Sequence, residues 1–287
     1  MDVYLLADVF ENFRKQAHAS YGLDPAMYLT MPSFSWDACL KLTDVHLELI
    51  QDPGIHLFFE NNIRGGISVI SHRYARANVP GTPDYNPEEP NSYILYVDAN
   101  NLYGWAMSRR LPIGQFVFLS EDEKAAFVVF KISDDSRTGY VLECDLEYPA
   151  ELHELHNDYP LAPQSLTITE DMLSSYCQSF GKKHFDCRKL VPNLLSKSKY
   201  VVHYQNLKFY LSHGLKLTKI HRILSFSQEE WMAPFVAFNT EKRQQAKTVV
   251  EQNMYKQSVN STFGKTCENV RNRRNIHLVC DPLGSKS

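Results

Sequence analysis

The stretch Lys256-Gln-Ser-Val-Asn260-Ser-Thr-Phe263-Gly264-Lys265, near the carboxyl end, is the most informative part of this sequence. On an α-helix Lys256, Asn260 and Gly264 lie along one stripe, because each is four residues from the next. An ammonium group and a carboxamide therefore face the same ligand. The pair suits a ligand that carries both a phosphate and a base.

The residues before this stretch predict a long helix that contains it. From Thr240 to about Phe263 the chain has neither Gly nor Pro, and Asn239 or Thr240 can cap the first turn. Gly264 is a helix-ending residue. We therefore expect one helix over 240–263.

A second informative stretch lies upstream, Tyr96-Val-Asp98-Ala99-Asn-Asn101-Leu102-Tyr103. Residues 92–98 alternate and are rich in β-formers, which predicts a strand that ends at Asp98. Residues 139–148 have the same character, and we expect the two strands to pair. Carboxylates at the strand ends then point into a shared cleft.

In the rest of the chain, Pro residues mark the loops between predicted elements, and there is no internal repeat. Apolar spacing predicts helices over 2–18 and 36–50, and the Pro-rich stretch 76–92 predicts a linker or extended surface loop. Residues 200–225 are mixed in character and receive no assignment. Between the two predicted helices a loop is indicated by Pro25, Pro32 and Ser33.

Size and composition indicate a folded protein of one or two domains. The chain has 287 residues, of which 44% are hydrophobic, and its six cysteines form no C-x-x-C pair, which favours reduced thiols in the cytosol or nucleus. No apolar run reaches the roughly 18 residues of a membrane span, and no signal peptide opens the chain. The expectation is an intracellular protein without a membrane partner.

The net charge of −3 conceals a strong division. Residues 1–180 carry 11 Lys and Arg against 26 Asp and Glu, a net charge of −15. Residues 181–287 carry 19 against 7, a net charge of +12. A cationic last third is typical of a surface that holds phosphates.

Both informative stretches resemble motifs of family B DNA polymerases, in the family's order. Residues 256–264 match K-x-x-x-N-S-x-[YF]-G of motif B, and residues 98–103 resemble D-x-x-S-L-Y of motif A. The resemblance is closest to the protein-primed branch of linear phage, adenovirus, linear plasmids and Maverick/Polinton elements. It runs from the first residues to about Arg274.

The Gly65-Gly66 pair is similar to a Gly pair that lies between the exonuclease and polymerase parts of that branch. Ile63-Arg64 precede it where the branch has a Tyr, so the tyrosine contact with template strand is not carried over.

The resemblance implies an α+β fold, part of a right-hand polymerase with an antiparallel palm sheet and helical fingers, preceded by a remnant of the exonuclease domain. Residues 1–75 would be that remnant with the Gly pair, and 76–92 the linker. Residues 93–235 would be the palm with an insertion that meets the priming protein, and 236–287 the fingers helix with motif B and a basic tail.

The resemblance also implies roles for residues of motif A. Asp98 would be the catalytic carboxylate and, with the Ala99 carbonyl, a ligand of Mg²⁺, because two such ions serve nucleotidyl transfer. Leu102 and Tyr103 would bind the nucleotide, with the Tyr103 ring beneath the incoming sugar, where a 2′-hydroxyl would collide with it. Asn101 stands where the family has Ser, and a Gly at position 104 replaces the usual Pro.

In the second motif Lys256 would contact the triphosphate and Asn260 would line the nascent base pair. Arg243 and Lys247 resemble a basic pair that grips the triphosphate in larger relatives. A straight helix would put Lys247 about half a turn from Lys256 and bring Lys242 to its face instead. We expect Arg243 and Lys247 nevertheless, since the helix can bend or break. The expected DNA-binding residues are Gly65, Gly66, Lys265, Arg271, Arg273 and Arg274.

The further acidic motif of the family, Asp-Thr-Asp, is not found after Gly264, where Glu268 and Asp281 are the only acidic residues. The resemblance therefore predicts a fragment with an incomplete two-metal site. The first two exonuclease motifs are absent and Asp2 resembles the last one, so proofreading is not expected.

The expected reaction of the parent enzyme is template-directed deoxynucleotidyl transfer. The expected partners are primer–template DNA, a deoxynucleoside triphosphate and a terminal priming protein. The expected location is the nucleus or cytoplasm, or the mitochondrion for a linear plasmid. The alternative is a non-enzymatic nucleic-acid-binding remnant of a mobile element or virus. The genomic DNA just downstream of Ser287 distinguishes the two, by encoding an in-frame Asp-Thr-Asp or not.

Overall fold

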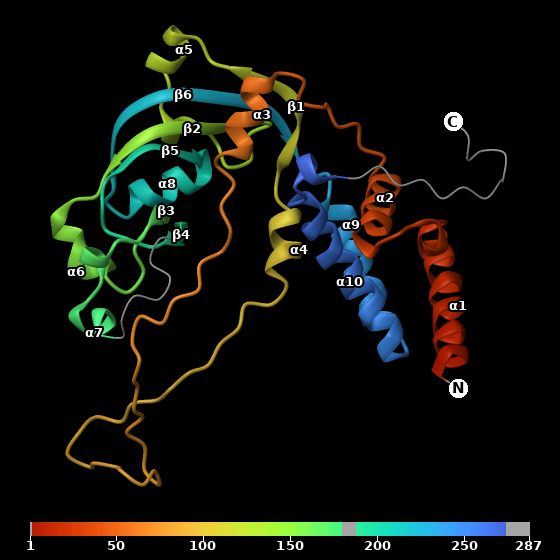
Figure 1. Cartoon of the computed structure of the whole chain (residues 1–287), viewed down its shortest axis with the longest axis horizontal. Coiled ribbons are helices and arrows are strands. Elements are labelled where there is room, and N and C mark those ends of the chain that lie inside the picture. The colour runs from red at the N-terminus through yellow and green to blue at the C-terminus, as the bar shows by residue number, and fades with distance from the viewer. Residues whose placement is uncertain (1, 180–187, 274–287) are drawn as a thin grey trace. The chain divides into compact units, whose positions relative to one another are not determined.

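The computed structural model describes residues 2–179 and 188–273 (Figure 1). Its contacts divide the chain into two compact units. The first, which we call the helical unit, comprises residues 1–47, 99–113 and 228–287, and the second, the sheet unit, comprises residues 48–98 and 114–227. The fold is mixed α/β with an antiparallel sheet, as the α+β expectation requires at this level of detail.

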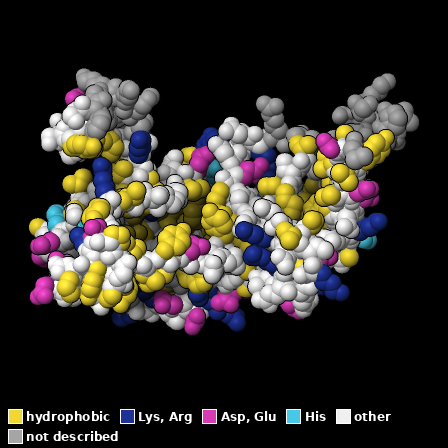
Figure 2. Space-filling model, turned by 90° about the horizontal axis from the view of Figure 1, so that it is seen from below, with side chains coloured by type: hydrophobic (Ala, Val, Ile, Leu, Met, Phe, Trp, Pro, Cys, Tyr) yellow, Lys and Arg dark blue, Asp and Glu magenta, His cyan; other side chains and the backbone are white. Residues whose placement is uncertain are grey.

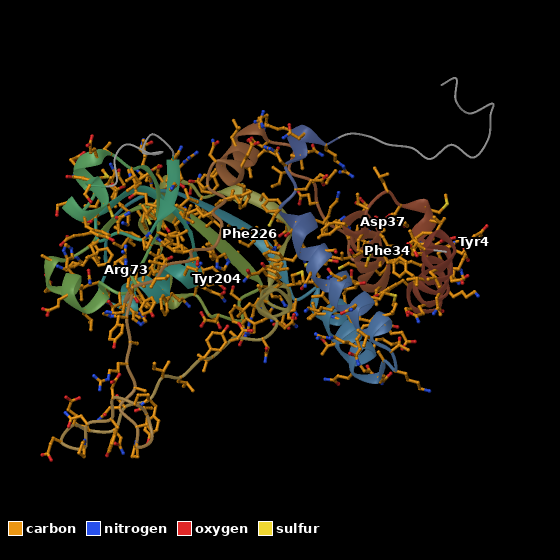
Figure 3. The ribbon with its side chains drawn as sticks, turned by 60° about the horizontal axis from the view of Figure 1, so that its bottom comes forward. Tyr4, Phe34, Asp37, Arg73, Tyr204 and Phe226 are labelled. Carbon is orange, nitrogen blue, oxygen red and sulfur yellow. The ribbon has the colours of Figure 1, made fainter. Side chains whose placement is uncertain are left out.

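The helical unit surrounds its carboxyl-terminal helix. Its helices are α1 (Asp2–Tyr21), α2 (Met31–Thr43), α4 (Leu102–Met107), α9 (Ala233–Gln245) and α10 (Val249–Thr266), with short 3₁₀ turns η1 (Pro25–Met27) and η5 (Val270–Asn272). Helix α10 packs against the other four helices. Phe34 of α2 is 1% exposed in this core, whereas Tyr4 near the start of α1 is 80% exposed (Figure 3).

A buried hydrogen-bond network fixes α10 against α1 and α9. The Tyr21 hydroxyl lies 2.6 Å from Asn239 Oδ1 and 3.2 Å from Ser258 Oγ. Asn239 Nδ2 in turn donates to the carbonyl of Phe235, and Ser258 Oγ donates to that of Met254. Because every member has a partner, the network specifies one packing of the three helices.

The prediction of one helix over 240–263 was wrong, because the chain breaks between α9 and α10. Ala246 is extended, with φ −63° and ψ 132°. The Thr248 hydroxyl then accepts from the Glu251 amide, while the Glu251 carboxylate accepts from the amides of Lys247 and Thr248. This capping box starts a new helix by satisfying amides that a continuous helix would bond to carbonyls.

The predicted end at Gly264 was also wrong. Helix α10 continues to Thr266, and the Cys267 amide closes its last turn on the carbonyls of Gly264 and Lys265. Gly264 does not adopt a left-handed conformation, so it does not act as a helix stop.

The two amino-terminal helices exist with shifted bounds. The helix predicted over 2–18 is confirmed as α1, which continues to Tyr21. The helix predicted over 36–50 is α2, which begins and ends earlier. Pro32, which we assigned to a loop, lies in the first turn of α2, where a missing amide hydrogen costs nothing, and Thr30 caps that turn.

The sheet unit is built on a four-stranded sheet of order β1-β6-β2-β5. The strands are β1 (Leu111–Phe118), β2 (Thr138–Glu147), β5 (Lys197–His203) and β6 (Lys216–Glu229). Strand β2 is antiparallel to both β5 and β6. Strands β3 (Gln164–Thr167) and β4 (Arg188–Val191) form a separate antiparallel pair. The predicted strand over 139–148 is confirmed as β2.

Short helices complete the sheet unit, α3 before the first strand and the others between strands. They are α3 (Pro53–Glu60), α5 (Glu121–Ala125), α6 (His153–His156), α7 (Ser175–Gln178) and α8 (Tyr204–Ser212), with 3₁₀ turns η2 (Val129–Lys131), η3 (Ala150–Leu152) and η4 (Glu170–Met172). The unassigned residues 200–225 thus contain most of β5, all of α8 and most of β6.

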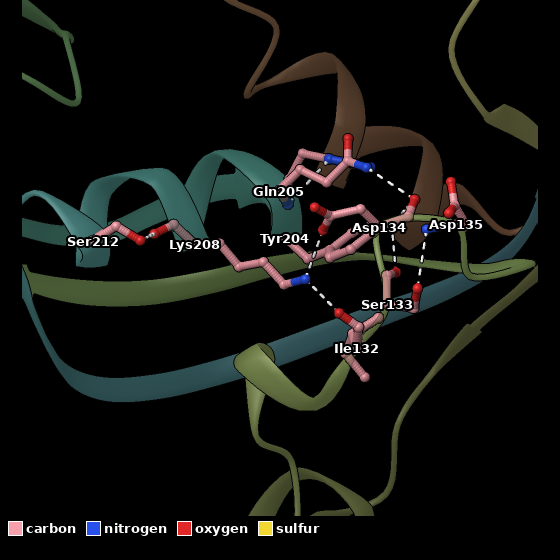
Figure 4. Close-up of polar contacts among 9 residues, drawn as sticks. Ile132, Ser133, Asp134, Asp135, Tyr204, Gln205, Lys208 and Ser212 are labelled. Atoms are coloured by element: carbon pink, nitrogen blue, oxygen red, sulfur yellow. Dashed lines mark hydrogen bonds and ion pairs between the residues drawn. The ribbon is translucent and has the colours of Figure 1, made fainter.

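Polar contacts anchor the first turns of α8 to the loop after η2 (Figure 4). Lys208 Nζ lies 2.7 Å from Asp134 Oδ1 and also donates to the carbonyl of Ile132. Gln205 Nε2 donates to the Asp134 carbonyl over 3.2 Å. These contacts hold α8 against the loop that leads from η2 to β2.

The prediction that residues 92–98 form a strand paired with 139–148 was wrong. In that segment Ser92 alone makes a bridge, to Asn78, and the side chains from Tyr93 to Val97 are 63–93% exposed. Both edges of β2 are occupied, one by β5 and the other by β6. The segment therefore has no place beside β2, whatever its β propensity.

The Pro-rich stretch 76–92 forms neither a helix nor a strand, as predicted, but it is ordered around Asn78. Asn78 Nδ2 donates to the carbonyls of Asn86, Glu89 and Pro90, and Asn78 Oδ1 accepts from the Asn86 amide. One buried amide side chain therefore closes the loop.

Many hydrophobic side chains reach the surface on the face that Figure 2 presents. The exposed large hydrophobic residues include several in α1 and all of those in segment 93–97. Within the described ranges no helix combines the length and the apolar character needed to cross a membrane.

Candidate functional site

Helix α10 carries the predicted stripe. Its opposite side is buried through Met254, Ser258 and Thr262, which are spaced by four residues. Lys256 is exposed and Asn260 is half-buried. No acidic side chain pairs with the Lys256 ammonium among residues 2–179 and 188–273, so its charge is available to an anionic ligand.

An aromatic stack joins the two motif-like segments within the helical unit. The rings of Tyr103 on α4 and Phe263 on α10 lie with centroids 4.0 Å apart and planes inclined by 13°. Tyr103 is 51% exposed, so one part of the ring stays accessible. Residues that are 160 positions apart in the sequence thus meet one turn from Asn260. Such a stack is worth roughly 0.5–1.5 kcal/mol beyond the area that it buries.

The start of α4 explains two departures from the motif A pattern. Asn101 has φ 54° and ψ 44°, a left-handed conformation that Asn tolerates better than most residues. A Cβ at Gly104 would lie 2.3 Å from Asn101 Nδ2 and 2.7 Å from Asn101 Cγ. The Asn101 side chain therefore occupies the space of a Cβ at position 104, and the two departures are physically coupled.

Asp98 and Ala99 lie on exposed chain before α4, not at a strand end. Their oxygens are of the kind that Mg²⁺ prefers, but one carboxylate and one carbonyl are too few for a two-metal site. In the described part of the chain no three His, Cys, Asp or Glu side chains come close enough to hold a metal ion. These residues alone do not fit the implied ion pair, and no reaction step is assigned to it.

The break between α9 and α10 separates the basic residues that precede α10. Arg243 is exposed in the last turn of α9, and Lys247 is exposed in the break itself. Lys242 is half-buried, with Nζ 5.6 Å from the Phe238 ring centroid. Because α9 and α10 are separate helices, Lys242 and Lys256 do not lie on one continuous helix face. The nucleotide contacts of Arg243 and Lys247 stay predictions.

The residues proposed for DNA differ in availability. Lys265 Nζ lies 2.6 Å from Glu268 Oε2, and this contact lowers the pKa of the Glu268 carboxyl. Arg271 and Arg273 are exposed in and just after η5, and Arg274 lies outside the described residues. Gly65 and Gly66 are exposed, and the space beside both α-carbons is open.

Two features of this region were missed in the sequence. The signal for the capping box was present as Thr248-x-x-Glu251 just before an apolar run. The stack of Tyr103 on Phe263 had no local signal, because the two rings come from distant segments.

This chain is similar to known proteins in three-dimensional structure but matches none by sequence. No protein-family model and no curated protein matches this chain. The orthorhombic crystal form of Phi29 DNA polymerase aligns with a TM-score of 0.50 at 15% identity, over 88% of this chain and 38% of that chain. Its post-translocation binary complex with primer-template DNA aligns with a TM-score of 0.50 at 16% identity, over 89% and 38%.

A third structure, the ternary complex of Phi29 DNA polymerase with primer-template DNA and incoming nucleotide substrates, aligns with a TM-score of 0.46 at 15% identity, over 86% and 37%. This chain therefore spans less than two fifths of the length of the polymerase that it resembles. At such identity the similarity concerns the fold alone, which resembles that of a part of Phi29 DNA polymerase.

Proposed function

We propose that this chain is part of a protein-primed family B DNA polymerase and takes part in template-directed deoxynucleotidyl transfer. The observation that carries the proposal is the stack of Tyr103 on Phe263. It brings Tyr103, at the end of the motif A-like segment, against the helix that bears Lys256 and Asn260. The fold similarity to a DNA polymerase supports it independently.

The proposed roles follow from the chemistry of the side chains. Lys256, exposed and without an acidic partner in the described residues, would bind the triphosphate through charge-assisted hydrogen bonds. Asn260, one turn further on, offers both a donor and an acceptor to a base. The half-exposed Tyr103 ring would contact the sugar and exclude a 2′-hydroxyl.

The finer parts of the proposal rest on the sequence resemblance. They are the division into exonuclease remnant, palm and fingers, the affinity with Maverick/Polinton elements, and the terminal priming protein as a partner. Asp98 as a catalytic carboxylate, Mg²⁺ as the cofactor and a nuclear, cytoplasmic or mitochondrial location belong to the same group. The boundaries at residues 75, 92 and 235 likewise stay predictions.

Nucleotide binding by the full 287-residue chain tests the proposal. We expect Lys256→Ala to weaken binding of a fluorescent deoxynucleoside triphosphate about tenfold, since a hydrogen bond to a charged group is worth roughly 1.5–3 kcal/mol. The matched control is Lys219→Ala, which removes another exposed ammonium, from β6. Equal losses of nucleotide affinity in the two variants would show that binding depends only on the net charge of the protein.

A primer-extension assay distinguishes an active polymerase from a protein that only binds nucleic acid. We expect the 287-residue chain to bind nucleotide and to extend a primed template poorly or not at all, because the described residues supply one candidate catalytic carboxylate. Extension by the purified chain that Asp98→Ala abolishes would contradict this inactivity. A chain that binds DNA but no nucleotide would instead favour the non-enzymatic alternative.

A further inference from the structure

The sheet unit contains a pocket that includes Gly65, one of the residues expected to bind DNA, and none of the nucleotide-site residues of helix α10. Its volume is about 350 Å³, at the lower end of the range of about 300–1,000 Å³ typical of small-ligand sites. Helix α3, the segment after it up to Gly65, strand β5 and helix α8 form its walls. All of them belong to the sheet unit, so the pocket is defined within one compact body.

The walls include several aromatic rings and one fixed cation. Phe59, Tyr200 and Tyr210 contribute rings to the lining. The guanidinium of Arg64 lies 4.2 Å from the centroid of the Tyr200 ring and also donates to the Val201 carbonyl. A guanidinium held in this way presents a planar surface and its other N–H groups without further loss of side-chain freedom.

The polar groups of the pocket favour a neutral, planar ligand linked to an anion. Burial lowers the pKa of His203 to about 4, so this imidazole is uncharged at neutral pH. No Asp or Glu is among the lining residues, which leaves Arg64 as the charged group of the wall. Asn206, exposed on α8, adds an amide that can donate and accept.

We propose that this pocket holds an unpaired base of a single DNA strand. Aromatic rings and a guanidinium plane stack on any base, an amide pairs with its edge, and the cation balances the neighbouring phosphate. The pocket and Lys256 belong to different units. The inference rests on the proposed function only in naming DNA as the polymer.

Removal of bases from the ligand tests the proposal on the unaltered chain. The probe is a fluorescein-labelled oligothymidylate of about ten nucleotides, within the usual range of single-strand sites. Its partner is an oligonucleotide of the same length with abasic sugars at the central positions, which keeps every phosphate. Fluorescence anisotropy should show the abasic strand binding about tenfold more weakly, since stacking of one base is worth that much.

Variants of the pocket then locate the effect. We expect Arg64→Gln and Asn206→Ala each to weaken oligothymidylate binding and to reduce the difference between the two probes. The control Arg73→Gln makes the same charge change in the sheet unit, at a guanidinium 6.0 Å from the Tyr176 ring and outside the pocket (Figure 3). It should preserve the difference. Circular dichroism and thermal melting establish that each variant is folded.

Several outcomes would overturn the inference. They are equal affinity for the two probes, equal effects of Arg64→Gln and Arg73→Gln, and failure of oligothymidylate to bind. If Arg64→Gln does not fold, the exposed Asn206→Ala and the abasic probe still decide the question. Lys256→Ala should leave the ratio of the two probe affinities unchanged, so the nucleotide site and the base pocket are tested separately.

Discussion

At the scale of single residues, the turn before α4 shows how one unusual side chain constrains another. Asn101 has a positive φ, and its side chain fills the space that a Cβ at Gly104 would need. Both positions lie within three residues of Tyr103, whose ring stacks on Phe263. The shape of this turn therefore determines where the Tyr103 ring lies.

We predict that Gly104→Ala destabilises the protein by about 1–2 kcal/mol, because the added methyl group overpacks the turn. In an Asn101→Gly background the same substitution should cost less, since the conflicting side chain is gone and Gly suits the positive φ. Urea unfolding of the two single variants and the double variant measures the coupling.

Gly264→Ala is the matched control for that experiment. It adds a methyl group to a helical Gly in open space and should stabilise the protein by roughly 0.5–1 kcal/mol. Additive effects of Gly104→Ala and Asn101→Gly would contradict the proposed conflict.

A second residue-scale prediction concerns Asp145 on β2. Its Oδ1 accepts from the Lys199 amide over 2.7 Å and from His221 Nε2 over 2.8 Å, and these bonds lower the pKa of its carboxyl. A lowered pKa in the folded state means that the stabilisation is present above the unfolded pKa of about 3.9 and is lost as the pH falls through the folded value.

Asp145→Asn should therefore reduce the free energy of unfolding by about 1 kcal/mol at pH 7. The difference from the unaltered chain should shrink below about pH 4. Urea unfolding between pH 2 and 7 measures it. A difference that is constant across this range would mean that the charge of Asp145 does not contribute.

At the scale of elements, the break between α9 and α10 is the feature that orients the candidate site. Glu251 makes it by accepting from the amides of Lys247 and Thr248, and its other oxygen accepts from Gln16 Nε2 of α1 over 3.0 Å. The first turn of α10 is thus tied to α1 as well as capped. Lys256 and Asn260 follow one and two turns later.

We predict that Thr248→Ala costs about 1 kcal/mol, the usual effect of losing an N-cap hydroxyl. Amide hydrogen exchange should become faster in the first turn of α10, where the Glu251 amide loses its acceptor. Thr266→Ala at the other end of α10 is the control and should leave that turn unchanged. Unaltered exchange at Glu251 in Thr248→Ala would argue against the cap.

At the scale of the whole molecule, the chain passes between the two units several times. The helical unit is assembled from three separate segments and the sheet unit from two. In the helical unit the core depends on contacts such as the Ser20–Tyr255 hydrogen bond, which joins residues 235 positions apart. The amino-terminal helix is therefore part of the fold of the carboxyl-terminal one.

We predict that deletion of residues 1–22 unfolds the helical unit but not the sheet unit. The deletion removes Ala17 and Tyr21 from the core and leaves buried polar groups of α9 and α10 without partners. Hydrogen exchange should show lost protection in α10 and retained protection in β2. Retained protection in α10 would contradict the dependence on α1.

The conservative variant Tyr21→Phe separates the hydroxyl from the helix. It removes only the bonds to Asn239 and Ser258 and should cost roughly 1–3 kcal/mol, because it leaves a buried polar group unsatisfied. Both units should stay folded in this variant.

Local patterns in the sequence predicted much of the framework. Apolar spacing identified α1, β alternation identified β2, and proline content identified the loop 76–92. The placement of Lys256 and Asn260 on one side of a helix also follows from spacing alone. These predictions succeed because helix and strand periodicity are properties of neighbouring residues.

Only the tertiary structure decided the rest. Segment 92–98 has the propensity of a strand, yet β5 and β6 occupy both edges of β2, and that competition is invisible in the segment itself. The stack of Tyr103 on Phe263 and the pocket between α3, β5 and α8 likewise join distant residues. Spacing determines which side of an element a residue occupies, whereas packing between elements determines what that side meets.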